Sequence, residues 1–189
     1  MSSTIVLFHS GLGLRPAVHT FADRLRAAGH TVHVPDIYDG EVFSDIADGV
    51  RKRDSLGVAE LARRSAAAVE SLPADLVYAG FSLGAAAAAY LATTRPGARA
   101  AVLMQGAPQP AMWGTTTWPK VPVQLHYAEA DPWVTASDVA SLATMVKAGG
   151  APFEAFVYPG SGHLFADEGL PDYDAASTEQ MLARFLKLV

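Results

Sequence analysis

The stretch Asp75-Leu76-Val77-Tyr78-Ala79-Gly80-Phe81-Ser82-Leu83-Gly84 passes from an apolar run into an alanine-rich segment, residues 85–91. The apolar run predicts a buried strand, and the alanines predict a helix. Between them, Gly80 to Gly84 has the spacing Gly-x-Ser-x-Gly, which is typical of a nucleophile elbow, a strained strand-to-helix turn. Glycine on either side lets the backbone pass close by without Cβ clashes. The pattern favours Ser82 as a nucleophile over a plain helix N-cap.

Composition limits the classes of protein that the chain can belong to. The 189 residues are half hydrophobic, carry a net charge of -5 and include no cysteine. We therefore expect one domain over residues 1–189, with no nucleic-acid footprint, no disulfide and no thiol catalysis. The N-terminus reads as a first strand and not a leader peptide, and no apolar stretch approaches the ~18 residues of a membrane span. A cytoplasmic protein is the expectation.

Strand and helix patterns alternate along the chain with short connections. This alternation predicts an α/β fold with a mostly parallel central sheet and helices on both faces. The expected strands are residues 4–8, 31–34, 75–79, 100–104, 121–127 and 153–158, and the expected helices are 16–28, 44–53, 58–71, 85–91, 135–147 and 173–188.

Two connections, residues 35–43 and 105–120, are long and rich in large apolar side chains. Loops beyond the carboxyl ends of parallel strands are where ligands bind in open α/β sheets. Trp113 and Trp118 in the second connection therefore either line a ligand site or cover the edge of the sheet.

A serine nucleophile needs a general base and an acid that orients the base. In α/β hydrolases these follow the serine in the chain order acid, then histidine, each after its own strand. Asp131 follows the strand 121–127, and His163 follows the strand 153–158. Glu129 lies nearer the strand end and competes with Asp131, which we favour because its loop position suits a carboxylate that holds an imidazole. The predicted catalytic residues are Ser82, Asp131 and His163.

The remaining site residues are expected around this group. The tetrahedral intermediate needs backbone N–H donors, for which Leu83 and Gly11 are the candidates, with Leu12 as the next choice. His9 is expected to shape the loop that carries Gly11. The expected substrate pocket comprises Leu12, Trp113, Trp118, Trp133, Leu164 and Phe165. No complete dinucleotide, Walker or His-Glu-x-x-His motif is present, so neither cofactor nor metal is expected.

Three segments are similar to one family. They are residues 9–15 (HSGLGLR), residues 28–40 (AGHTVHVPDIYDG) and residues 158–165 (YPGSGHLF). Over nearly its whole length the chain resembles the dienelactone hydrolase family. The resemblance implies an α/β-hydrolase fold without a large lid domain, a hydrolytic mechanism and His163 as the base.

The chain departs from that family at three positions. Enzymes that act on dienelactone have a cysteine at the position of Ser82, a glutamate where Ser10 stands, and an arginine where Asp167 stands. An anionic lactone is expected to meet Asp167 and Glu168. The chain is therefore expected to hydrolyse small or short-chain esters, lactones or thioesters as a monomer or small homo-oligomer. A non-catalytic binding protein and an acyltransferase remain alternatives.

Overall fold

A six-stranded, entirely parallel sheet forms the centre of the computed structural model, which describes residues 2–189. The strand order is β2-β1-β3-β4-β5-β6. The strands are β1 (Thr4–Phe8), β2 (Thr31–His33), β3 (Leu76–Phe81), β4 (Ala100–Met104), β5 (Val123–Ala128) and β6 (Phe153–Tyr158). The α/β-hydrolase fold expected from the sequence is confirmed.

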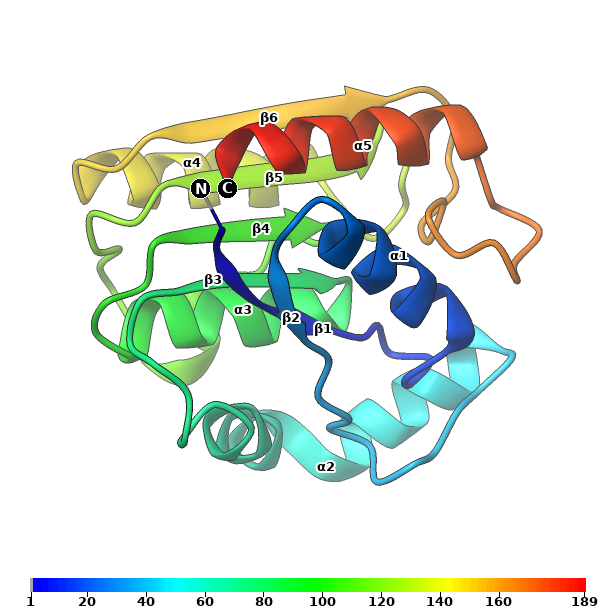
Figure 1. Ribbon diagram of the computed structural model, residues 1–189, viewed down its shortest axis with the longest axis horizontal. Helices are drawn as coiled ribbons and strands as arrows, with labels where there is room; N and C mark the ends of the chain where they lie inside the picture. Colours follow the sequence, from blue (N-terminus) through cyan, green and yellow to red (C-terminus); the bar gives the residue numbers. More distant parts are fainter. Residues whose placement is uncertain (1) are drawn as a thin grey trace.

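Helices cover both faces of the sheet. Figure 1 shows α1 and α5 on one face, with α2, α3 and α4 on the other. Their bounds are α1 (Pro16–Ala27), α2 (Ile46–Ala67), α3 (Leu83–Thr94), α4 (Ala136–Ala148) and α5 (Ala175–Leu188), and a 3-10 turn, η1, spans Pro110–Trp113. None of the helices among residues 2–189 has the length and apolar character needed to cross a membrane.

The central strands feed two separate hydrophobic cores, because successive side chains point to opposite faces of a sheet. In β1, Val6 and Phe8 belong to the core that also contains residues of α2, α3 and α4, whereas Ile5 and Leu7 belong to the core that contains residues of α1 and α5. Burial on both faces explains why β1, β3 and β4 read as continuous apolar runs in the sequence.

The helix expected at 44–53 and the one expected at 58–71 are joined in the structure. They form α2, which is interrupted at Gly57 (φ 74°, ψ 166°). Glycine adopts this left-handed conformation without a Cβ penalty. The helical conformation then ends at Ala67, earlier than expected. At the C-terminus, the Asp174 carboxylate accepts a hydrogen bond from the Ser177 amide, so α5 starts at Ala175 and not at Tyr173.

All six strands run in the same direction, so their carboxyl ends meet at one edge of the sheet. The loops that follow β1, β3, β5 and β6 therefore come together there. Each of these loops carries one group of candidate site residues from the sequence.

Candidate active site

The turn between β3 and α3 places Ser82 in a strained backbone conformation, with φ 51° and ψ -106°. The Ser82 amide donates to the Met104 carbonyl at 2.7 Å, which ties the turn to the end of β4. A Cβ at Gly80 would lie 2.2 Å from the Gly84 backbone, and one at Gly84 would lie 2.4 Å from the Phe8 carbonyl oxygen. Gly80 is therefore needed for the strand to lie against the start of α3, and Gly84 is needed for the turn to pack against β1.

The turn brings the Ser82 hydroxyl to the imidazole of His163. Oγ of Ser82 lies 2.8 Å from Nε2 of His163, and Nδ1 of His163 lies 2.8 Å from Oδ2 of Asp131. A carboxylate can only accept, so Nδ1 carries the ring proton and Nε2 is left to accept from the serine hydroxyl. In this arrangement His163 can remove the hydroxyl proton when Ser82 attacks an electrophile.

Asp131, and not Glu129, contacts the histidine. Asp131 and His163 are only 6% and 7% exposed, and the Asp131 carboxylate also accepts the Trp133 amide at 2.9 Å. Glu129 lies exposed in the turn before it. The Trp133 ring packs 5.7 Å, centroid to centroid, from the His163 ring. Asp131 is therefore fixed on the buried side of the imidazole.

Gly11 and Leu83, the two candidate oxyanion donors, line the same cleft as Ser82. Leu83 is the first residue of α3, where the N–H groups have no acceptor within the helix and the helix dipole favours negative charge. Among residues 2–189, neither the Leu83 nor the Gly11 amide donates to another backbone group. The Leu12 amide instead donates to Oγ of Ser10 at 3.2 Å. Within the part of the chain that the structure describes, the Leu83 and Gly11 amides therefore have no backbone acceptor, as an oxyanion donor requires.

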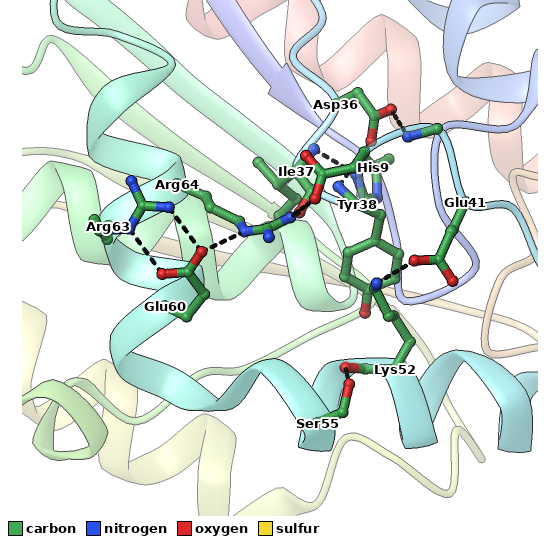
Figure 2. Close-up of polar contacts among 12 residues, drawn as sticks. His9, Asp36, Ile37, Tyr38, Glu41, Lys52, Ser55, Glu60, Arg63 and Arg64 are labelled. Atoms are coloured by element: carbon green, nitrogen blue, oxygen red, sulfur yellow. Dashed lines mark hydrogen bonds and ion pairs between the residues drawn. The ribbon is translucent and has the colours of Figure 1, made fainter.

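The buried His9 fixes the loop that carries Gly11. Nδ1 of His9 donates to the Ser10 carbonyl at 2.7 Å, and Nε2 accepts the Ile37 amide at 3.1 Å. Burial lowers the pKa of His9, against smaller raising effects from the Ser10 carbonyl and Asp36. His9 is therefore neutral and joins two loops. Figure 2 shows His9 next to the segment that carries Asp36 and Ile37.

Helix α2 closes over the same loop. A Cβ at Gly49 would lie 2.3 Å from the Gly11 carbonyl oxygen, so the helix backbone packs directly on Gly11. Further along α2, the Arg64 guanidinium donates to the Ile37 carbonyl at 3.0 Å and pairs with Asp39 and Glu60 (Figure 2). Both halves of α2 are thus attached to the loops that surround the serine.

A cleft of 250 Å³ exposes Ser82 and His163. A neighbouring cavity of 220 Å³ shares Trp133 and His163 with this cleft, and Leu12 and Leu164 also line it. A third cavity of 400 Å³ is lined by Trp113 and shares Leu83, Ala86 and Met112 with the cleft. Four of the expected pocket residues therefore lie around the site: Leu12, Trp113, Trp133 and Leu164.

Two of the expected pocket residues lie elsewhere. Phe165 is buried in the core beneath α1 and α5, with its ring 5.1 Å from that of Tyr158. Trp118 is buried beside α4, and its indole N–H donates to the Val121 carbonyl at 2.8 Å. The sheet-edge role for Trp118 is the one that the structure favours.

Asp167 does not face the cleft as the family comparison led us to expect. Its carboxylate pairs with Arg15, with 2.5 Å between Nε and Oδ2. Glu168 accepts a hydrogen bond from Thr20 at 3.0 Å, outside the site. An anionic substrate at Ser82 would therefore not meet these two carboxylates.

The cleft also contains residues that the sequence did not indicate. Gln105 follows β4, has a φ of 58° and is 1% exposed, and neither of its side-chain amide atoms has a partner among residues 2–189. Arg53 of α2 lines the cleft as well. Gln105 follows the end of a predicted strand, a position that could have identified it.

The fold is that of an α/β hydrolase. A sequence model of the dienelactone hydrolase family matches residues 2–189. The chain therefore belongs to the dienelactone hydrolase family, and it is a hydrolase. A comparison with curated proteins gave no match.

Solved structures support the fold. A dienelactone hydrolase-like promiscuous phosphotriesterase, P91, from metagenomic libraries is 23% identical with a TM-score of 0.86, covering 98% of this chain and 84% of P91. Esterase 2 of Thermogutta terrifontis, solved with propionate bound, is 17% identical with a TM-score of 0.70, covering 98% of this chain and 82% of the esterase. At these identities the likeness concerns the fold alone.

Proposed function

We propose that the protein hydrolyses carboxylic esters, with Ser82 as the nucleophile, His163 as the general base and Asp131 as the residue that orients His163. The observation that carries the proposal is the continuous hydrogen-bonded chain from Oγ of Ser82 through His163 to the buried Asp131 carboxylate. A serine in this setting can be deprotonated as it attacks, which an isolated hydroxyl cannot be at neutral pH.

The reaction proceeds in two halves. Oγ of Ser82 bonds to the acyl carbon while its proton passes to Nε2 of His163, and the Leu83 and Gly11 amides hold the oxyanion. The C–O bond then breaks, the alcohol leaves with that proton, and an acyl-serine remains. Water attacks the acyl-serine, gives a proton to His163 and releases the carboxylic acid, and the proton returns to Oγ. One ester and one water yield one acid and one alcohol.

Ser82→Ala tests the proposal against the binding-protein alternative. We expect this variant to lose turnover of p-nitrophenyl acetate by about 10⁵-fold or more. A fluorophosphonate probe should label wild-type Ser82 and not the variant. Ser71→Ala, an exposed serine far from the cleft, is the matched control and should remain active. Full activity of Ser82→Ala would rule the proposal out.

The acyltransferase alternative uses the same acyl-serine but a different acceptor. Product analysis in water containing added alcohol separates the two, because a hydrolase yields mainly the free acid. If most acyl groups were transferred to the alcohol, the protein would be an acyltransferase and the hydrolysis proposal would be wrong.

A further inference from the structure

Two helices face each other across an unfilled space next to the nucleophile. The second half of α2 presents one face toward α3, and α3 presents one face in return, each with helical spacing. The residues are Val58, Leu61, Ala62 and Ser65 from α2, and Leu83, Ala86, Ala87 and Tyr90 from α3. The space between them has a volume of 400 Å³.

Small side chains leave this space open. Ala62, Ala86 and Ala87 stand where helix pairs usually bring larger residues into contact. Protein interiors contain few voids larger than a water molecule. A volume of 400 Å³ is more than twice the ~150 Å³ of a cavity that binds benzene.

Hydrogen bonds outside the cavity fix the position of the loop that forms part of its wall. Ile37 lines the cavity, and its carbonyl accepts a hydrogen bond from Arg64 on α2. Figure 2 shows Arg64 joined to Glu60 within its own helix and to the loop that carries Ile37. These contacts tie α2 to the neighbouring loop, so the cavity is preformed.

The cavity borders the catalytic cleft. Leu83, Ala86 and Met112 line both spaces, and Leu83 is the residue directly after Ser82. A group bound between α2 and α3 can therefore be joined to a carbonyl carbon at Ser82.

The lining suits an uncharged, apolar group. The Ser65 hydroxyl donates a hydrogen bond to the Leu61 carbonyl at 2.8 Å, so it does not need a partner from a ligand. The charged lining residues Arg53 and Asp54 form an ion pair with each other and add no net charge to the cavity. Val58 and Met112 at the rim are 40% and 57% exposed, so apolar surface there faces water when the cavity is empty. Exposed apolar surface that lines a concave site is typical of ligand-binding grooves.

We propose that this cavity binds the apolar tail of the substrate, a medium-length unbranched alkyl chain or an aryl group. The proposal rests on the ester hydrolysis proposed above and names the substrate class for that site. It moves the expected preference from short chains to medium-length or aromatic ones.

Chain-length series test the proposal on both sides of the ester bond. p-Nitrophenyl esters from acetate to decanoate extend the acyl side, and alkyl acetates of the same lengths extend the alcohol side. In one series, kcat/KM should rise about threefold per added methylene up to roughly eight carbons and then level off. The series that rises identifies the part of the ester that enters the cavity. Flat profiles in both series would overturn the proposal.

Ala62→Phe and Ala66→Phe form a matched pair on α2. Ala62 lines the cavity, and Ala66 is exposed one turn further along the helix. Ala62→Phe should lower the ratio of kcat/KM on the octyl substrate to kcat/KM on the acetate at least tenfold, whereas Ala66→Phe should leave both values unchanged. An equal loss on all chain lengths, or an unchanged profile in Ala62→Phe, would contradict the proposal. If Ala62→Phe does not fold, Ala87→Leu, which fills the cavity from α3, is used instead, with the same expected result.

A binding measurement separates this proposal from ester hydrolysis itself. Calorimetric titration with 1-octanol should show binding to Ser82→Ala and at least tenfold weaker binding when Ala62→Phe is added. If no ester is turned over at any length, the hydrolysis proposal fails, but octanol binding that is lost with Ala62→Phe still supports the cavity as an apolar site. Absence of octanol binding together with flat chain-length profiles would reject the cavity proposal alone.

Discussion

The Arg15 guanidinium and the Asp167 carboxylate form an ion pair that joins the loop after β1 to the loop after β6. Both side chains are largely buried, at 14% and 11% exposure. Asp167 also accepts the Gly169 amide at 2.9 Å, which shapes the segment that follows His163. The pair therefore holds together the two loops that carry Gly11 and His163.

Arg15→Met should lower the free energy of unfolding by about 2–3 kcal/mol, because it leaves the Asp167 carboxylate buried without its partner. Urea unfolding at pH 7 measures the change. Arg63→Met removes an exposed ion pair with Glu60 and should cost no more than about 0.5 kcal/mol. Adding Asp167→Leu to Arg15→Met should recover part of the loss. Equal effects of the two single arginine variants would refute the structural role of the pair.

Asp131→Asn should lower kcat by about 10⁴-fold with little change in stability, since an amide no longer holds His163 in the tautomer that accepts the serine proton. Steady-state kinetics with p-nitrophenyl acetate measure the loss. Glu129→Gln makes the same chemical change two residues away on an exposed side chain and should stay within twofold of wild type. A large loss in Glu129→Gln would assign the acid role to that residue instead.

Gly11→Ala tests whether Gly11 is needed for the substrate to approach its amide or for the packing of the loop. A Cβ at Gly11 meets no atom within 4 Å, so the variant should fold with wild-type stability. Its methyl group would stand beside the amide proposed to hold the oxyanion, and kcat/KM should fall about 10- to 100-fold. Gly84→Ala is the contrasting change, because its Cβ would lie 2.4 Å from the Phe8 carbonyl oxygen, and it should unfold the turn. Wild-type kinetics in Gly11→Ala would show that the second oxyanion donor is an amide other than that of Gly11.

His126 should make the protein less stable in acid. Burial lowers the pKa of His126 from 6.5 to about 3, and the Arg184 cation acts in the same direction. Its Nδ1 lies 2.9 Å from the Tyr158 hydroxyl. As pH falls from 6.5 to about 3, His126 is protonated in the unfolded chain but stays neutral in the folded protein. The free energy of unfolding therefore decreases by about 1.4 kcal/mol per pH unit.

His126→Phe should reduce the loss of stability between pH 7 and 4.5 by about 2–3 kcal/mol. Urea unfolding at both pH values measures it. His9, whose pKa is also lowered by burial, should keep part of the slope in the variant. His19→Phe replaces an exposed histidine and is the control. An unchanged slope in His126→Phe would show that the folded protein accepts the proton.

The sequence predicted the layers of the fold because burial on both faces makes the central strands continuous apolar runs. It missed the joining of α2 across Gly57 and the 3-10 turn at 110–113. A glycine in the left-handed region allows either a loop or a brief interruption of a helix, and only contacts with α3 and the neighbouring loops decide between them.

Within the site, position after a strand end located Ser82, Asp131 and His163, because the parallel topology brings strand ends together. The pocket was harder to predict. Phe165 and Trp118 have the composition of pocket residues, but their orientation depends on packing against α5 and α4. The ion pair between Arg15 and Asp167 joins residues 152 positions apart, which no local pattern indicates.

The interruption at Gly57 divides α2 into two parts with different neighbours. Before it, Ile46, Gly49 and Val50 border the space above Ser82, and Arg53 borders both spaces. After it, Val58, Leu61, Ala62 and Ser65 border the apolar cavity. Changes in the second half should alter which tail is preferred while leaving the reacting carbonyl undisturbed. Substitutions in one helix could then change the preference for the substrate tail and the surroundings of the reactive centre separately.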